Sequence, residues 1–152
     1  MRAVRAVRGA IQVDVDDRTA ILDCAATLIQ HVLERNAIEP DDLISMIFTA
    51  TPDLTAEFPA YAARQLGLTD VPLLCATEIA VPGAMPRVLR VLVHAESDRS
   101  REAIRHVYLG GAAALRTDLP QLGSPSTGQL ADLAHLGRCV PLTRRQWWRP
   151  VA

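Results

Sequence analysis

Two apolar, strand-like runs in the middle of the chain carry polar side chains where apolar ones would be expected. The first run, VPLLCA at residues 71–76, contains Cys75 and is followed by Glu78. The second run, VLRVLVHA at residues 88–95, places Arg90 between apolar neighbours. Burying a guanidinium there costs free energy unless an anionic or strongly accepting group meets it. Arg90 is therefore either half of a structural ion pair with Glu78 or a cation that meets an anionic ligand.

Further side chains able to do chemistry stand at the ends of strands and in turns, and most of them are cationic. Arg8 comes just before Gly9, which would let the backbone approach something closely. The complete set of candidates is Arg8, Phe58, Arg64, Cys75, Glu78, Arg90, Tyr108 and Arg116. A group of hydrogen-bond donors of this kind suits a small dianion whose reaction needs charge stabilisation rather than proton transfer.

The sequence lacks the motifs of several other kinds of chemistry. It contains no Ser-His-Asp arrangement, no glycine-rich phosphate loop, and no cysteine or histidine spacing typical of a metal site. All 16 basic residues are arginine, which excludes a Schiff-base lysine and a P-loop lysine. The four histidines are scattered, and none is placed as an obvious base. We therefore expect neither a metal site nor lysine chemistry.

Composition indicates a folded globular protein. The chain has 152 residues, 49% of them hydrophobic and 22% charged, which is enough for one domain with a sizeable core. The formal net charge of −1 gives no general attraction to nucleic acid or to membranes. No signal peptide is evident, and no apolar run approaches the ~20 residues that a membrane span needs. We expect a soluble, cytoplasmic protein.

The elements that must position these side chains follow from periodicity and from turn signals. Acidic residues at 14–17 can cap a long helix that runs to about Asn36. We expect strands at 2–15, 43–50, 71–76 and 88–95, short helices at 59–66 and 101–107, and a last strand at 112–116.

These elements predict an α+β fold with a mixed sheet of about five strands, one long helix and short helical turns. One helix can cover only one face of such a sheet, so the other face must meet something, and oligomerisation is the natural solution. Residues 1–120 form the predicted domain. Residues 121–152 differ in composition, being richer in Gly, Ser, Pro and Gln, and we expect a poorly ordered tail there.

At this point the chain resembles the small trimeric chorismate mutases with a pseudo-α/β-barrel assembly, not the all-helical class. Several separated motifs carry the resemblance in order over almost all of residues 1–120. They are VRAVRGAI at 4–11, FTATPDLTAEFPAYAARQL at 48–66, VPLLCATEIAV at 71–81, RVLRVLV at 87–93, and IRHVYL with ALRTDL within 104–119. The tail is not covered.

The resemblance implies an isomerase that converts chorismate to prephenate in the biosynthesis of phenylalanine and tyrosine. It further implies a homotrimer with sites at subunit interfaces. In this reading Arg90, Glu78 and Cys75 are the catalytic residues: Arg90 donates to the ether oxygen, Glu78 accepts from the ring hydroxyl, and Cys75 lies beside it.

The resemblance also gives the remaining candidates their roles in binding substrate. Arg8 and Tyr108 would hold carboxylates, Phe58 would wall the pocket from a neighbouring subunit, and Arg64 and Arg116 would gate or complete it. The chain departs from the family at Tyr61, where a basic residue is expected, and in its long tail. Two alternatives stay open: a trimeric enamine or imine deaminase or metabolite-binding module with an interfacial arginine, and a purely structural trimer.

Overall fold

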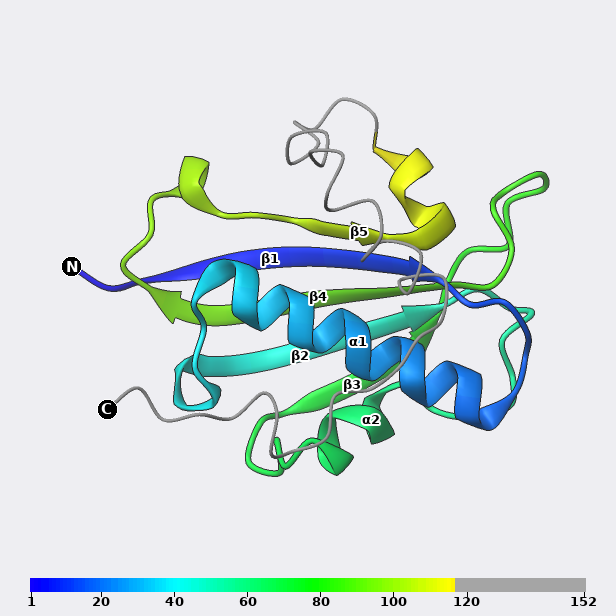
Figure 1. Cartoon of the computed structure of the whole chain (residues 1–152), viewed down its shortest axis with the longest axis horizontal. Coiled ribbons are helices and arrows are strands. Elements are labelled where there is room, and N and C mark those ends of the chain that lie inside the picture. Colours follow the sequence, from blue (N-terminus) through cyan, green and yellow to red (C-terminus); the bar gives the residue numbers. More distant parts are fainter. Residues whose placement is uncertain (117–152) are drawn as a thin grey trace, which may run out of the picture.

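The computed structural model describes residues 1–116, which form one five-stranded sheet with a long helix on one face (Figure 1). Along the chain the regular elements are β1 (Ala3–Gln12), α1 (Arg18–Asn36), β2 (Leu43–Ala50), α2 (Ala60–Gln65), β3 (Leu73–Thr77), β4 (Val88–Ser97) and β5 (Val107–Leu109). Three 3-10 helices complete the order: η1 (Pro40–Asp42) before β2, η2 (Arg101–Ala103) before β5, and η3 (Gly110–Leu115) after it.

The sheet is mixed, and β4 is its central strand. The strand order is β3-β2-β4-β1-β5. β4 runs antiparallel to β1 and to β2, whereas the two edge strands are parallel to their neighbours, β3 to β2 and β5 to β1. The predicted α+β class and five-stranded mixed sheet are confirmed.

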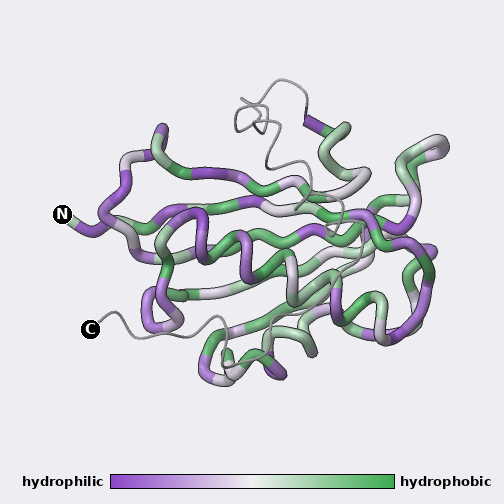
Figure 2. Tube along the Cα trace, viewed as in Figure 1, coloured by the Kyte–Doolittle hydropathy of each residue, from purple (hydrophilic) through white to green (hydrophobic). Residues whose placement is uncertain are grey.

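The main core lies between the sheet and α1, which crosses one sheet face (Figure 1). Asp17 caps the helix as predicted, its carboxylate accepting the backbone N–H groups of Thr19 and Ala20. Apolar residues along α1, such as Ile21 and Leu28, are fully buried. Hydropathy colouring shows the strands beneath the helix as mostly apolar and the surrounding turns as mostly polar (Figure 2).

Within the described residues, the opposite face of the sheet is covered only at one end. There η3 folds over the sheet and forms a small second cluster, which contains Ala10, Val88 and Ala112 with Met85, Tyr108 and Leu115 around them. Elsewhere, large apolar side chains of the strands are exposed, including Val4 and Leu74 at 58% and 59%. Residues 1–116 therefore leave part of the sheet without a covering layer, as the presence of one long helix predicts.

The C-terminal part of the described chain differs from the prediction. The expected helix at 101–107 is only the 3-10 turn η2, and the last strand is at 107–109 instead of 112–116. Ala112 to Leu115 belong to η3, because Gly110 adopts a positive φ of 57° and ends the strand pairing with β1. The predicted tail, 121–152, lies outside the described residues. Within residues 1–116 no helix is long and apolar enough to cross a membrane.

Candidate active site

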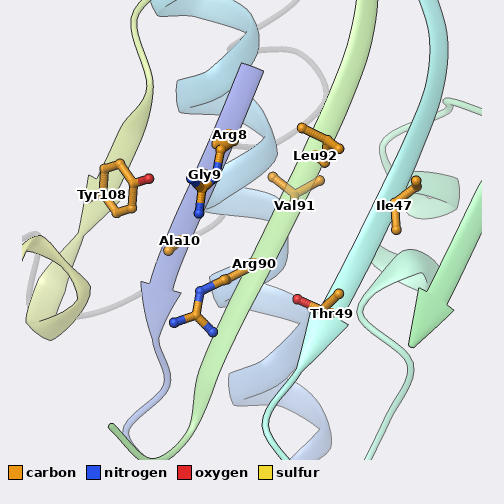
Figure 3. Close-up of a pocket in the computed structure, with 9 residues that line it drawn as sticks. All are labelled: Arg8, Gly9, Ala10, Ile47, Thr49, Arg90, Val91, Leu92 and Tyr108. Atoms are coloured by element: carbon orange, nitrogen blue, oxygen red, sulfur yellow. The ribbon is translucent and has the colours of Figure 1, made fainter. Parts of the chain in front are cut away.

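A partly open pocket of about 250 Å³ lies on the sheet face that α1 does not cover. Side chains from β1, β2, β4 and β5 line it (Figure 3). The strand register explains their proximity: Ala10 is opposite both Arg90 and Tyr108, and Arg90 is opposite Thr49. The lining residues are Arg8, Gly9, Ala10, Ile47, Thr49, Arg90, Val91, Leu92 and Tyr108.

Arg90 projects from the central strand and is fixed by an ion pair. Its Nη1 donates to Oε2 of Glu78, and Thr49 Oγ1 donates to the other carboxylate oxygen at 2.7 Å. The Glu78 side chain is 15% exposed, whereas that of Arg90 is 34% exposed. The pair predicted as one interpretation of the sequence is therefore present, and its guanidinium also faces the pocket. Glu78 holds the cation in place without removing it from the pocket.

Tyr108 brings a hydroxyl group to the same pocket from the edge strand β5. Its oxygen is buried, and no group among the described residues hydrogen-bonds to it. A buried polar atom without a partner is uncommon and costs free energy, so this hydroxyl is suited to meet a polar group of a ligand. Arg8 lies across from it on β1 (Figure 3). The pocket thus combines two guanidinium groups with a hydroxyl that lacks a partner.

Cys75 is not brought to this pocket. In the pairing of β3 with β2 it is opposite Phe48, which is fully buried, and its half-buried side chain packs against the main core. It therefore lies on the sheet face that the helices cover, whereas Arg90 faces the other side. Burial raises the pKa of the Cys75 thiol, a change that a backbone hydrogen bond with Ala60 partly opposes. The thiol is consequently kept protonated at neutral pH.

Phe58 and Arg64 lie away from the pocket of their own chain. Phe58 is 71% exposed and Arg64 is also exposed. The loop that carries Phe58 is anchored to the start of α1: Asp16 accepts three hydrogen bonds from Thr55 and Ala56, and Glu57 pairs with Arg18. These contacts fix the loop in a position where the Phe58 side chain is exposed.

Two further predicted features can be placed. Arg116, the last described residue, follows η3 and is partly exposed. Tyr61 stands where a basic residue was expected, and the Arg18 guanidinium lies 5.5 Å from the centre of its ring. A cation is therefore present beside the aromatic ring, although a different residue supplies it.

Sequence reasoning missed two residues of this region, Thr49 and His106. Thr49 lies in the strand predicted at 43–50, and alternation would have put it on one face with Ile47, but which face bears the site depends on the pairing with β4. His106 accepts a hydrogen bond at its Nδ1 from the Arg8 backbone N–H, at 3.0 Å. The available signal was its place in the motif IRHVYL, two residues before Tyr108.

Fold and pocket together define a class: a small α+β protein with two guanidinium groups, those of Arg8 and Arg90, in a pocket on the sheet face that α1 does not cover. The sequence model of the family "Chorismate mutase type I" matches residues 4–119. Two relatives named chorismate mutase AroH align over 117 residues, which is 76% of the chain. The relative from Thermus thermophilus is 49% identical over 96% of its length, and that from Bacillus subtilis (strain 168) is 39% identical over 92%.

A solved structure gives the same result for the fold. A chorismate mutase from Clostridium thermocellum superposes with a TM-score of 0.72 at 43% sequence identity, covering 72% of this chain and 98% of the other. The chain belongs to the chorismate mutase type I family.

Proposed function

We propose that this protein is a chorismate mutase, which isomerises chorismate to prephenate in aromatic amino acid biosynthesis. The reaction is an intramolecular Claisen rearrangement: the ether C–O bond breaks while a C–C bond forms, and no atom enters or leaves. It needs no cofactor and no covalent intermediate. The observation that carries the proposal is Arg90, which Glu78 fixes on the central strand so that it faces a pocket of small-molecule size.

Arg90 is the residue that acts on the breaking bond. Negative charge develops on the ether oxygen in the transition state, and a fixed guanidinium there stabilises that state more than the ground state. Its backbone lies in a strand with partners on both sides, opposite Ala10 and Thr49, so little reorganisation is needed. Together with selection of one compact conformer, this contribution can supply the ~8 kcal/mol typical of enzymes with modest rate enhancement.

The other residues hold the substrate in that conformer. Arg8 and Tyr108 bind carboxylates, Tyr108 through the hydroxyl that otherwise lacks a partner. Glu78 retains lone pairs beyond those used by Arg90 and Thr49, so it can also accept from the ring hydroxyl. Cys75 has the weakest support of the proposed residues, because its side chain packs on the other face of β3.

We further propose that the active assembly is a cytoplasmic homotrimer with one site at each subunit interface. The uncovered sheet face and the outward-facing Phe58 support this assembly. Phe58 and Arg64 of one subunit would then complete the pocket formed by the strands of its neighbour, with Arg116 closing it.

The direct test is to follow the ultraviolet absorbance of chorismate with the purified protein and to identify the product chromatographically. Loss of chorismate with equimolar prephenate, in metal-free buffer with chelator, is the expected result. Release of ammonia from small enamines or imines, without turnover of chorismate, would contradict the proposal and favour the deaminase alternative.

A further inference from the structure

His106 connects β1 and β5 beside the pocket without lining it. Its Nδ1 accepts the Arg8 backbone N–H at 3.0 Å, so in the neutral ring the proton resides on Nε2. The backbone pairing of β1 with β5 covers only three residue pairs, from Gly9–Val107 to Ile11–Leu109. The ring therefore extends a short strand pairing by one further contact.

This contact lies between two groups that face the ligand. Arg8 supplies the N–H itself, and Tyr108 lies in β5, two residues after the histidine. Any change in the distance between β5 and β1 at this point alters the spacing of the Arg8 guanidinium and the Tyr108 hydroxyl. Both side chains line the pocket, whereas the imidazole does not.

We propose that His106 is a positioning residue, whose neutral imidazole holds Arg8 and Tyr108 at the spacing that anion binding requires and gives up that spacing on protonation. The inference rests on the proposed function, since it takes chorismate as the anion. A protonated ring would direct an Nδ1–H donor at the Arg8 N–H donor, and the two cannot hydrogen-bond. β5 must then shift relative to β1.

The charges around the ring favour its neutral form. Burial is the main reason that the pKa of His106 is lowered, and the cations Arg8 on β1 and Arg116 after η3 lower it further. These two are the charged groups that act on the ring within the described chain. We therefore expect the acid-induced loosening below the ordinary histidine pKa of about 6.5, where the carboxylates of chorismate remain ionised.

Two substitutions distinguish the effect of the hydrogen bond at Nδ1 from the effect of removing the rest of the ring. In His106→Asn the side-chain oxygen can occupy the place of Nδ1 and accept the same N–H, whereas in His106→Gln the oxygen falls near the place of Nε2 and cannot. At pH 7.5 we expect His106→Gln to raise KM about five- to tenfold, which corresponds to the loss of one hydrogen bond, with kcat within twofold of wild type. His106→Asn should keep KM within about twofold.

The pH profile gives a readout that a purely structural role would not change. Between pH 8 and 5, at constant ionic strength, KM of the wild type should rise on the acid side, while KM of His106→Asn stays flat. His31→Gln is the control, because His31 also has a pKa lowered by burial but lies on α1 and does not line the pocket. An acid rise shared by wild type and His106→Asn would overturn the proposal, as would a fall of KM in acid.

Nitrogen NMR of the wild-type imidazole tests the inference independently of turnover. We expect an unprotonated Nδ1 at pH 7.5, and an Arg8 amide shift that follows the titration of the ring. The opposite tautomer would overturn the proposal even if His106→Gln failed to fold. Absence of turnover by the wild type would instead contradict the proposed function, and the Arg8 amide would still report whether the ring holds β1.

Discussion

At the scale of the residue, Arg90 combines fixation with access to a ligand. Glu78 pairs with one guanidinium nitrogen, and the side chain still keeps 34% exposure on the pocket face. Arginine stays charged at any pH the fold withstands, so the electrostatic contribution needs no proton transfer. A neutral side chain of similar shape would preserve packing and remove only the charge.

Arg90→Gln, or citrulline at this position, should therefore lower kcat by at least 10²- to 10³-fold while KM changes much less, because the charge acts mainly in the transition state. Steady-state kinetics with chorismate provide the measurement, and Arg101→Gln on the exposed η2 turn is the matched control. A kcat near that of wild type would refute the assignment. Arg90→Lys should be milder only if the ammonium group reaches the same oxygen.

Catalysis without proton transfer also predicts the pH dependence of kcat. Guanidinium groups as a class keep their charge from about pH 6 to 9, so kcat should be nearly flat over this range. The acid effect expected from His106 acts on KM, because the ring is proposed to position groups that bind the substrate. Its lowered pKa keeps the ring neutral until the pH falls below the usual histidine range. Initial rates at saturating chorismate decide the matter. A steep limb of kcat near pH 6.5 would indicate a titrating base and favour hydrolysis.

At the scale of the element, the distance between α1 and β1 depends on Gly9. A Cβ built at this position would lie 2.9 Å from Leu28 Cδ1 and 3.0 Å from Val32 Cγ2. β1 can approach the helix only where this side chain is absent. The adjacent residue, Arg8, faces the other side of the sheet. The contact of Gly9 with α1 therefore also fixes the position of the β1 backbone beneath the pocket.

Gly9→Ala should consequently destabilise the fold by about 1–3 kcal/mol through overpacking. Combining it with Leu28→Ala should cost less than the sum of the two single changes, because the added methyl group partly fills the space that the leucine leaves. Urea unfolding of the four proteins in this cycle measures the coupling. Strict additivity would show that the helix is not in contact with Gly9.

The sequence predicts elements well where periodicity and caps agree. The strand at Leu43–Ala50 and the Asp17 cap of α1 are confirmed, because apolar runs and capping chemistry are local. The last strand was misplaced, since three residues at Val107–Leu109 carry too little pattern, and only pairing with β1 makes them a strand.

Site residues are harder to predict, because the face on which a side chain lies depends on register. Arg90 was found as a charge within an apolar strand. Cys75 and Glu78 were grouped because they are close in sequence. In an extended chain, however, residues three positions apart point their side chains to opposite faces. The hydrogen bond from Arg8 to His106 joins segments 98 positions apart, and no local pattern reports such a contact.

At the scale of the whole molecule, the proposed trimer would divide the site between subunits. Arg8, Glu78, Arg90 and Tyr108 cluster on one sheet, whereas Phe58 projects outward with 71% exposure. Mixing Arg90→Ala with Phe58→Asp, each inactive alone, should restore activity under conditions that exchange subunits. Some mixed trimers would then carry an interface with neither lesion.

Two outcomes would contradict this division. No recovery after verified exchange would place each site within a single subunit. Sedimentation equilibrium that gives a monomer at micromolar concentration would exclude the trimer itself. The matched control is a mixture of Arg90→Ala with Arg8→Ala, which both lie on the same sheet. Every interface in these mixed trimers carries at least one lesion, so activity should not return.

The strand order also sets when this architecture can be completed during synthesis. β1 is made first, yet its neighbours are β4 and β5, and Gly9 pairs with Val107 near the end of the described chain. At roughly 5–20 residues per second on the ribosome, β1 waits on the order of 5–20 s for its last partner. Arg8 can be placed once β4 has emerged, because it is opposite Leu92, but Tyr108 joins the pocket last. The complete pocket therefore forms only after nearly all of the described chain has been made.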